Sequence, residues 1–109
     1  MLRIDGHKIT LTRGDTLTIT LTLKKNGQAY TPEEGDVIRF ALARGYVGEP
    51  GYQLKLSKTI PNDTLTFTLS SQETTLDYRD YNYDIEVTHS DGCVDTFISS
   101  TLTITGEVK

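Results

Sequence analysis

Polar and apolar residues alternate without a break in the stretch Thr16-Leu17-Thr18-Ile19-Thr20-Leu21-Thr22-Leu23. Successive side chains of a β-strand point to opposite faces of its sheet, so this alternation produces one apolar and one polar face. We therefore expect Leu17, Ile19, Leu21 and Leu23 to point into a core and the four threonines to face water. Threonine is β-branched and suits a pleated, half-exposed surface. The stretch predicts a strand with one buried face.

The same rhythm recurs along the chain, separated by clusters of glycine, proline, asparagine and aspartate. The spacing of these clusters, about 8–12 residues, is typical of a β-sandwich or barrel with short connections. The expected strands cover residues 2–4, 8–12, 16–25, 28–30, 37–43, 52–59, 64–69, 81–88, 93–98 and 101–105. Because the shortest of these ranges can join neighbouring strands, we predict an all-β, antiparallel sandwich of about 7–8 strands.

Several connections have recognisable turn chemistry. Asn26-Gly27 suits a type I′ turn, because both residues tolerate positive φ angles. Strands 52–59 and 64–69 are expected to form a hairpin across Pro61-Asn62-Asp63. Ser70 and Glu73 have the spacing of a capping box, which predicts one short helical turn over residues 70–76. The glycine- and proline-rich segment 44–51 is the largest expected loop.

Length and composition limit the classes of function. A chain of 109 residues predicts one domain over residues 1–109. Its single cysteine excludes an internal disulfide, which fits a reducing cytoplasm. A formal charge of −4 without a basic stripe makes nucleic acid a poor partner. No apolar run is long enough to span a bilayer and no secretory signal opens the sequence, so we expect neither membrane association nor export.

Residues with catalytic or metal-binding chemistry do not occur at useful spacing. His7 and His89 fall in expected turns, where solvent exposure is the ordinary interpretation. Cys93 has no partner at zinc-ligand spacing and is expected to be half buried and inert. The aspartates match no calcium-binding loop. We therefore expect no catalytic residue, no metal and no cofactor, and a protein that is not an enzyme.

The tyrosines carry the remaining information about function. Tyr81 and Tyr83 open an expected strand, and either residue is placed to act as a tyrosine corner, which hydrogen-bonds back to the chain just upstream in immunoglobulin-type sandwiches. Tyr46, Tyr52 and Tyr78 are candidates for contact with a partner, because tyrosine offers a large contact area at low entropic cost.

Five segments taken together resemble a known class of module. They are Arg13-Gly14-Asp15-Thr16, Lys25-Asn26-Gly27-Gln28-Ala29-Tyr30, Gly35-Asp36-Val37-Ile38-Arg39-Phe40, Tyr81-Asn82-Tyr83-Asp84-Ile85-Glu86-Val87 and Ser90-Asp91-Gly92-Cys93-Val94-Asp95-Thr96. The chain resembles small immunoglobulin-like modules encoded by phages and prophages of Gram-positive bacteria, among them modules of baseplate and tail proteins. The likeness covers nearly the whole chain.

This resemblance implies a structural or adaptor role in a phage particle. The implied partners are phage structural proteins or a second copy in a weak homo-oligomer, since sandwiches present free strand edges. The protein would be cytoplasmic at synthesis and then associated with the virion. The resemblance transfers no catalytic residue. The alternative is a carbohydrate-binding or adhesion domain that uses segment 44–51 and the tyrosines.

Overall fold

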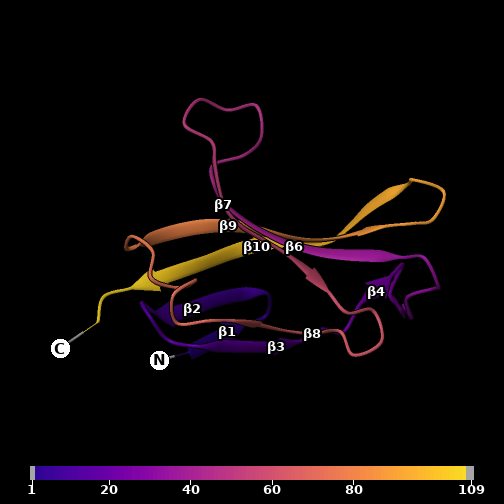
Figure 1. Ribbon diagram of the computed structural model, residues 1–109, viewed down its shortest axis with the longest axis horizontal. Coiled ribbons are helices and arrows are strands. Elements are labelled where there is room, and N and C mark those ends of the chain that lie inside the picture. The colour runs from indigo at the N-terminus through magenta and orange to yellow at the C-terminus, as the bar shows by residue number, and fades with distance from the viewer. Residues whose placement is uncertain (1, 108–109) are drawn as a thin grey trace.

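The computed structural model describes residues 2–107, and within this range the regular structure consists of β-strands alone (Figure 1). The strands are β1 (Leu2–Asp5), β2 (Lys8–Thr12), β3 (Leu17–Thr20), β4 (Lys24–Lys25), β5 (Gln28–Ala29), β6 (Val37–Arg44), β7 (Gln53–Ile60), β8 (Thr66–Leu69), β9 (Arg79–Thr88) and β10 (Val94–Thr105). The expected domain 1–109 extends past this range by Met1, Val108 and Lys109, which lie outside the described residues. No helix in the described range is long and apolar enough to cross a membrane.

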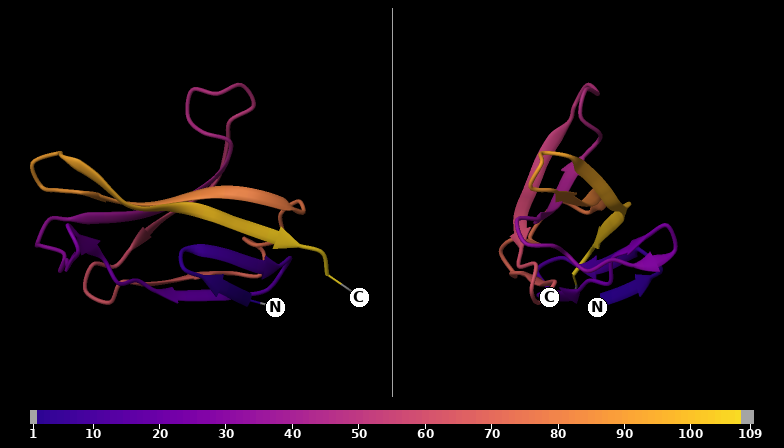
Figure 2. Two further views of the ribbon diagram at one scale, coloured as in Figure 1. Left: turned by 180° about the vertical axis from the view of Figure 1, so that it is seen from behind. Right: turned by 90° about the vertical axis from the view of Figure 1, so that its right-hand side faces the viewer.

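The strands form two layers that enclose the core, as the views in Figure 2 show. A six-stranded sheet has the order β1-β2-β10-β9-β6-β7, and the pair β3-β8 lies opposite it. Neighbouring strands are antiparallel except β2 and β10, which are parallel. A small hairpin, β4-β5, turns through Asn26 and Gly27 at φ 54° and 79°, as a type I′ turn requires. The prediction of a mostly antiparallel, sandwich-like all-β fold is confirmed.

The expected buried faces are confirmed in most strands. Leu17 and Leu23 are buried, Ile19 and Leu21 are half-buried, and the intervening threonines are exposed. The predicted strand 16–25 is nevertheless interrupted after β3. Leu21 still donates its amide to Leu65 of the β8 side, whereas the Leu23 carbonyl accepts from Tyr30 beside the β4-β5 hairpin. Between Leu21 and Leu23 the chain therefore stops pairing with the β8 side and begins to pair with the segment that follows β5.

The predicted hairpin between strands 52–59 and 64–69 is wrong. β7 pairs with β6 in the large sheet, whereas β8 pairs with β3 in the opposite layer. The connection crosses between layers, and it includes Leu65 at a φ of 55°. Lys58 links the two strands, because its Nζ donates to the Thr68 carbonyl and to Glu73 Oε1, both at 2.7 Å. The Thr68 carbonyl of β8 therefore accepts a hydrogen bond from a lysine of β7.

The predicted strands 93–98 and 101–105 form one strand, β10, which begins at Val94. The register between β10 and β9 shifts between Thr96 and Ile98, which marks a bulge at Phe97. A bulge breaks the strict alternation of faces. Phe97 and Ile98 consequently both pack, partly buried, against the core. Strict alternation therefore does not describe the buried face of this segment.

The predicted helical turn over residues 70–76 is also wrong. Both capping-box hydrogen bonds are present: the Glu73 amide donates to Ser70 Oγ at 3.2 Å, and the Ser70 amide donates to Glu73 Oε1 at 2.9 Å. The segment forms a hydrogen-bonded turn instead, because Thr74 directs its hydroxyl to the Asp15 carbonyl at 2.7 Å. This long-range bond ties the turn to the segment that precedes β3.

Tyr81 makes the hydrogen bond expected of a tyrosine corner. Its ring is buried at the start of β9, and its hydroxyl donates to the Asp77 carbonyl at 2.9 Å. The hydroxyl of Tyr83 instead donates to the His7 carbonyl in the turn between β1 and β2. Burial raises the pKa of both tyrosines. The two residues thus fix β9 to different parts of the chain.

Candidate binding site on the projecting arm

The connection between β6 and β7 projects from the sandwich as an arm (Figures 1 and 2). We define the arm as residues 45–54, which are this connection and the first two residues of β7. The register between β6 and β7 shifts between Leu42 and Ala43, so that Lys55 is an extra residue on β7. A bulge of this kind bends the strand that carries it and increases its twist. The shift lies where the hairpin leaves the sheet and accounts for the direction of the arm.

Glu49 organises the tip of the arm. Its carboxylate accepts a hydrogen bond from the Tyr46 amide at 2.8 Å, and its own amide donates to the Tyr46 carbonyl at 3.0 Å. The Glu49 carbonyl in turn accepts from the Tyr52 amide at 3.2 Å. At the base, the Asn82 side chain donates to the Gly45 carbonyl at 3.1 Å. The arm is therefore an ordered turn structure that is tied to β9.

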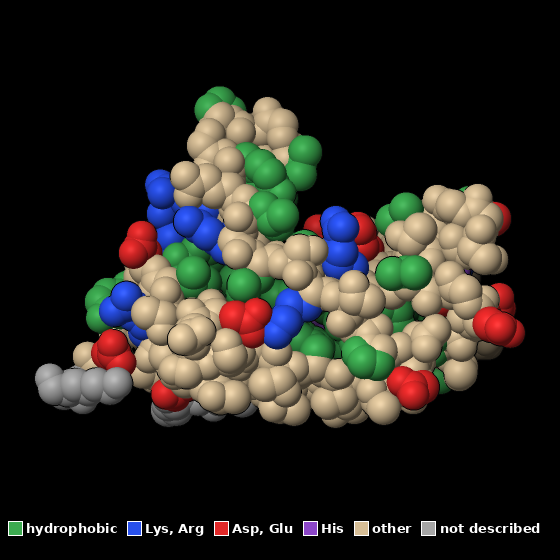
Figure 3. All heavy atoms as spheres, in the orientation of Figure 1, with side chains coloured by type: hydrophobic (Ala, Val, Ile, Leu, Met, Phe, Trp, Pro, Cys, Tyr) green, Lys and Arg blue, Asp and Glu red, His purple; other side chains and the backbone are tan. Residues whose placement is uncertain are grey.

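Large apolar side chains are exposed on this arm. The exposed fractions are 57% for Tyr46, 82% for Val47 and 51% for Leu54. Figure 3 shows hydrophobic side chains along one side of the arm, facing a hollow between the arm and the body of the molecule. Exposed apolar groups gathered in one place are typical of protein–protein contact sites.

The hollow is a groove on the outer face of the large sheet, with a volume of about 160 Å³. Its floor follows β6, where Ala41 and Ala43 point outward and fill little space. Three outward residues of β6 each have one neighbour on β7 and one on β9. These cross-strand rows are Leu54–Ala43–Asn82, Ser57–Ala41–Asp84 and Thr59–Arg39–Glu86. Tyr46 and Val47 form the wall on the side of the arm.

The opposite wall carries charge. Arg39 and Glu86 form an ion pair at 3.7 Å, and both side chains line the groove. Asp84, in the next row, has no cationic partner among the residues that the structure describes. The groove therefore combines an apolar wall, a floor of small side chains and one uncompensated carboxylate.

The structure brings together two of the three tyrosines expected to contact a partner. Tyr46 and Tyr52 both line the groove. Tyr78 lies elsewhere, where the Arg13 guanidinium carbon is 5.7 Å from its ring centroid. Neither Asp84 nor the floor of the groove was predicted from the sequence. Two alanines at outward positions of a strand were the available signal, because alanine is depleted in strands.

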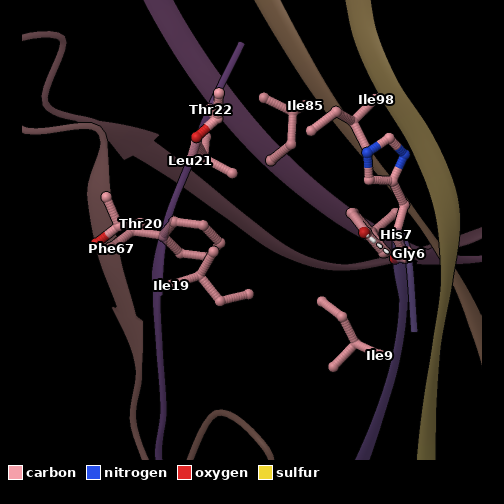
Figure 4. Close-up of a pocket in the computed structure, with 11 residues that line it drawn as sticks. Gly6, His7, Ile9, Ile19, Thr20, Leu21, Thr22, Phe67, Ile85 and Ile98 are labelled. Carbon is pink, nitrogen blue, oxygen red and sulfur yellow. Dashed lines mark hydrogen bonds between the residues drawn. The ribbon is translucent and has the colours of Figure 1, made fainter. Parts of the chain in front are cut away.

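A second opening leads into the core between β3 and the large sheet (Figure 4). This cavity has a volume of about 240 Å³, and its walls are core side chains contributed by both layers. The apolar lining consists of Ile9, Ile19, Leu21, Phe67, Ile85 and Ile98. Thr20, Thr22 and His7 stand at its edge. The half-exposed state of Ile19 and Leu21 follows from this opening.

The most charged cluster in the described residues is centred on His89. Its Nδ1 lies 3.0 Å from Asp36 Oδ1, and its Nε2 lies 2.8 Å from Asp95 Oδ2. A carboxylate only accepts hydrogen bonds, so both contacts are satisfied together when each ring nitrogen carries a proton, and they favour the imidazolium form. Asp36 also accepts from the Tyr30 hydroxyl, and Lys25 Nζ donates to Asp95 at 3.1 Å. The cluster joins the β4-β5 and β9-β10 hairpins.

The titration of these groups reflects their contacts. Hydrogen bonds to Asp95 and Asp36 raise the pKa of His89, and the Tyr30 hydrogen bond is the main cause of the lowered pKa of Asp36. The same bond to Asp36 raises the pKa of Tyr30 to about 12. The prediction that His89 is a solvent-exposed turn residue is wrong, because its side chain is only 20% exposed and is held between two carboxylates.

Catalysis is not favoured by this cluster or by the cysteine. Both nitrogens of His89 are engaged, so neither is available as a base. Cys93 is exposed rather than half buried, and its interaction with Asp91 raises the pKa of the thiol, which disfavours the nucleophilic thiolate. Within residues 2–107, histidine, cysteine and carboxylate side chains form no group of three that could hold a metal ion.

No protein-family model matches the chain, and no curated protein matches it.

Proposed function

We propose that this protein is a non-enzymatic structural or adaptor module of a phage or prophage particle, and that it binds a neighbouring protein through the arm and the groove beneath it. The observation that carries the proposal is the arm itself. It is ordered by Glu49 and anchored by Asn82, yet it presents Tyr46, Val47 and Leu54 to solvent. Holding apolar groups in a fixed exposed geometry reduces the entropic cost of binding a partner.

The strand order supports the resemblance on which the phage assignment rests. We assign β10-β9-β6 to strands G, F and C of an immunoglobulin-like sandwich, and the pair β3-β8 to strands B and E. The hydrogen bond from Tyr81 to Asp77 lies at the start of the strand that corresponds to F, where a tyrosine corner is expected. Fold alone does not specify function, so the arm remains the decisive feature.

A second candidate function is carbohydrate binding. Tyr46 and Tyr52 line the same groove as Asn82 and Asp84, and this combination offers rings for stacking and polar groups for sugar hydroxyls. An array of bacterial cell-wall and host glycans tests this alternative. Saturable binding of one glycan class, lost on Tyr46→Ala, would replace the adaptor proposal.

Co-expression with the products of adjacent genes tests the adaptor proposal. We expect the protein to copurify with at least one product of a capsid or tail gene and to be found in purified particles. The double variant Val47→Ser, Leu54→Ser should lose this association. Val94→Ser serves as the matched control, because Val94 is an apolar side chain with a similar exposed fraction, 55%, on β10. Retention by the double variant, or loss by the control alone, would contradict the assignment of the arm.

A further inference from the structure

The charge of the groove indicates the chemistry of its partner, provided that the proposed binding function is correct. Asp84 stands beside Ala41, whose methyl group leaves the carboxylate open to the groove. The neighbouring ion pair already satisfies Glu86 through Arg39. A bound segment that placed an apolar group against Asp84 would bury an unpaired carboxylate, which is costly. A lysine or arginine at this point would instead form an ion pair with it.

The same argument disfavours a second copy of this chain as the occupant. The protein carries a formal charge of −4, so two copies repel each other on average. β9 adds a further outward acidic residue, Asp80, which lies two rows beyond Asp84 along the strand. A basic segment of another protein is attracted by this face, whereas an acidic chain is not.

The rows of the sheet set the spacing of the basic and the apolar contact along β6, and the two contacts lie on opposite sides of this strand. Asp84 belongs to the row of Ala41, and Leu54 belongs to the adjacent row of Ala43. Adjacent outward rows are two residues apart along β6, or about 6.6–6.8 Å. An extended chain running along β6 has the same repeat between its residues i and i+2. Its side chains at i and i+2 can therefore reach Asp84 and the apolar side chains of Leu54 and Val47 at the same time.

We propose that the groove binds an extended segment of a partner protein in which a lysine or arginine lies two residues from a large apolar residue. The basic side chain pairs with Asp84. The apolar side chain rests over Ala43 against Leu54, Val47 and Tyr46. The narrow floor of alanines allows the bound backbone to approach the sheet closely, and the arm covers one side of it.

Selection from a library of displayed random dodecapeptides tests this proposal on the intact protein. We expect enriched peptides to carry a lysine or arginine at i and an aliphatic or aromatic residue at i±2. Synthetic versions of these peptides should bind Asp84→Lys about tenfold more weakly or worse. Asp63→Lys is the matched control, because it makes the same change in net charge at an exposed loop position before β8, and it should leave affinity unchanged. Binding should also weaken as salt is raised from 0.05 M to 0.5 M, as expected for an exposed ion pair.

Two outcomes overturn the inference. One is an enriched set without basic residues, or no enrichment over the Asp84→Lys, Leu54→Ser double variant used as bait. The other is equal binding of the peptides to Asp84→Lys and Asp63→Lys. Circular dichroism of each variant establishes that it is folded before binding is compared.

Failure of this inference is distinguishable from failure of the proposed function. A neighbouring phage protein that requires Val47 but binds Asp84→Lys normally would preserve the adaptor function and exclude the basic-segment model. A chain that enriches basic, apolar peptides but associates with no product of its own gene cluster would preserve the groove chemistry and exclude the proposed phage role.

Discussion

Removal of the Glu49 carboxylate should loosen the arm without unfolding the protein. Glu49→Ala eliminates the 2.8 Å hydrogen bond to the Tyr46 amide but leaves the backbone bonds of the turn in place. A net contribution of about 1 kcal/mol is reasonable for one such exposed bond. Since 1.4 kcal/mol corresponds to a factor of ten, the open population of the arm should rise about fivefold.

Native-state amide hydrogen exchange at Tyr46 measures this opening directly. We expect exchange at Tyr46 to accelerate about fivefold or more, because its amide loses its acceptor, while amides of β9 remain protected. The global free energy of unfolding should fall by no more than the same amount, about 1 kcal/mol, since the residues of the arm tip do not belong to the core. Affinity for the partner should fall by up to the factor by which the ordered population falls.

The matched control is Glu34→Ala, which removes an exposed glutamate from the loop before β6. This variant should leave the Tyr46 exchange rate and the partner affinity unchanged. A preformed arm would be excluded if Glu49→Ala left the Tyr46 amide exchanging at the wild-type rate. It would also be excluded if Glu49→Ala and Glu34→Ala lowered the affinity for the partner equally.

Three further predictions concern the sandwich. Leu23→Ala should cost about 2–5 kcal/mol of unfolding free energy in urea, whereas Leu21→Ala should cost about half as much or less, because Leu21 borders the open cavity and is already partly hydrated; a larger loss for Leu21 would contradict the placement of this cavity. Tyr81→Phe should cost about 1 kcal/mol, since the ring stays buried and only the corner hydrogen bond is lost; an unchanged urea midpoint would show that the corner does not stabilise the fold. The raised pKa of His89 means that its contribution is complete below the unfolded value of about 6.5 and is lost as pH rises through the folded pKa, while the lowered pKa of Asp36 means that the contribution of this carboxylate is lost only in acid; the stability difference between wild type and His89→Gln should therefore be larger at pH 5.5 than at pH 9, and the opposite trend would exclude an imidazolium.

The strands and their buried faces could be predicted because alternation is a local property. In residues 16–23 the face follows directly from the period of two, and the only correction is the exposure of Ile19 and Leu21 at the cavity. Layer assignment is not local. The sequence of residues 52–69 is equally compatible with a hairpin and with a crossing between layers, and the packing of the two sheets decides in favour of the crossing.

The candidate site could likewise be predicted only in part from the sequence. The glycine- and proline-rich composition of segment 44–51 predicted a large loop, and its tyrosines suggested contact with a partner. The groove depends on registers that bring Ala41, Asp84 and Ser57 into one row from three separate strands. The His89 cluster likewise joins His89 to Asp36 across 53 positions of sequence. Contacts of this range have no signature in the spacing of a single sequence.

Site-specific photocrosslinking tests the central claim most directly. A benzophenone amino acid is placed at position 47 on the arm, or at position 94 on β10 as the control, and the protein is irradiated within assembled particles or with its copurifying partner. The arm model predicts that position 47 forms a crosslink to one phage structural protein and that position 94 forms little or none. Equal crosslinking from both positions, or a crosslink from position 94 alone, would contradict the claim that the arm is the binding surface.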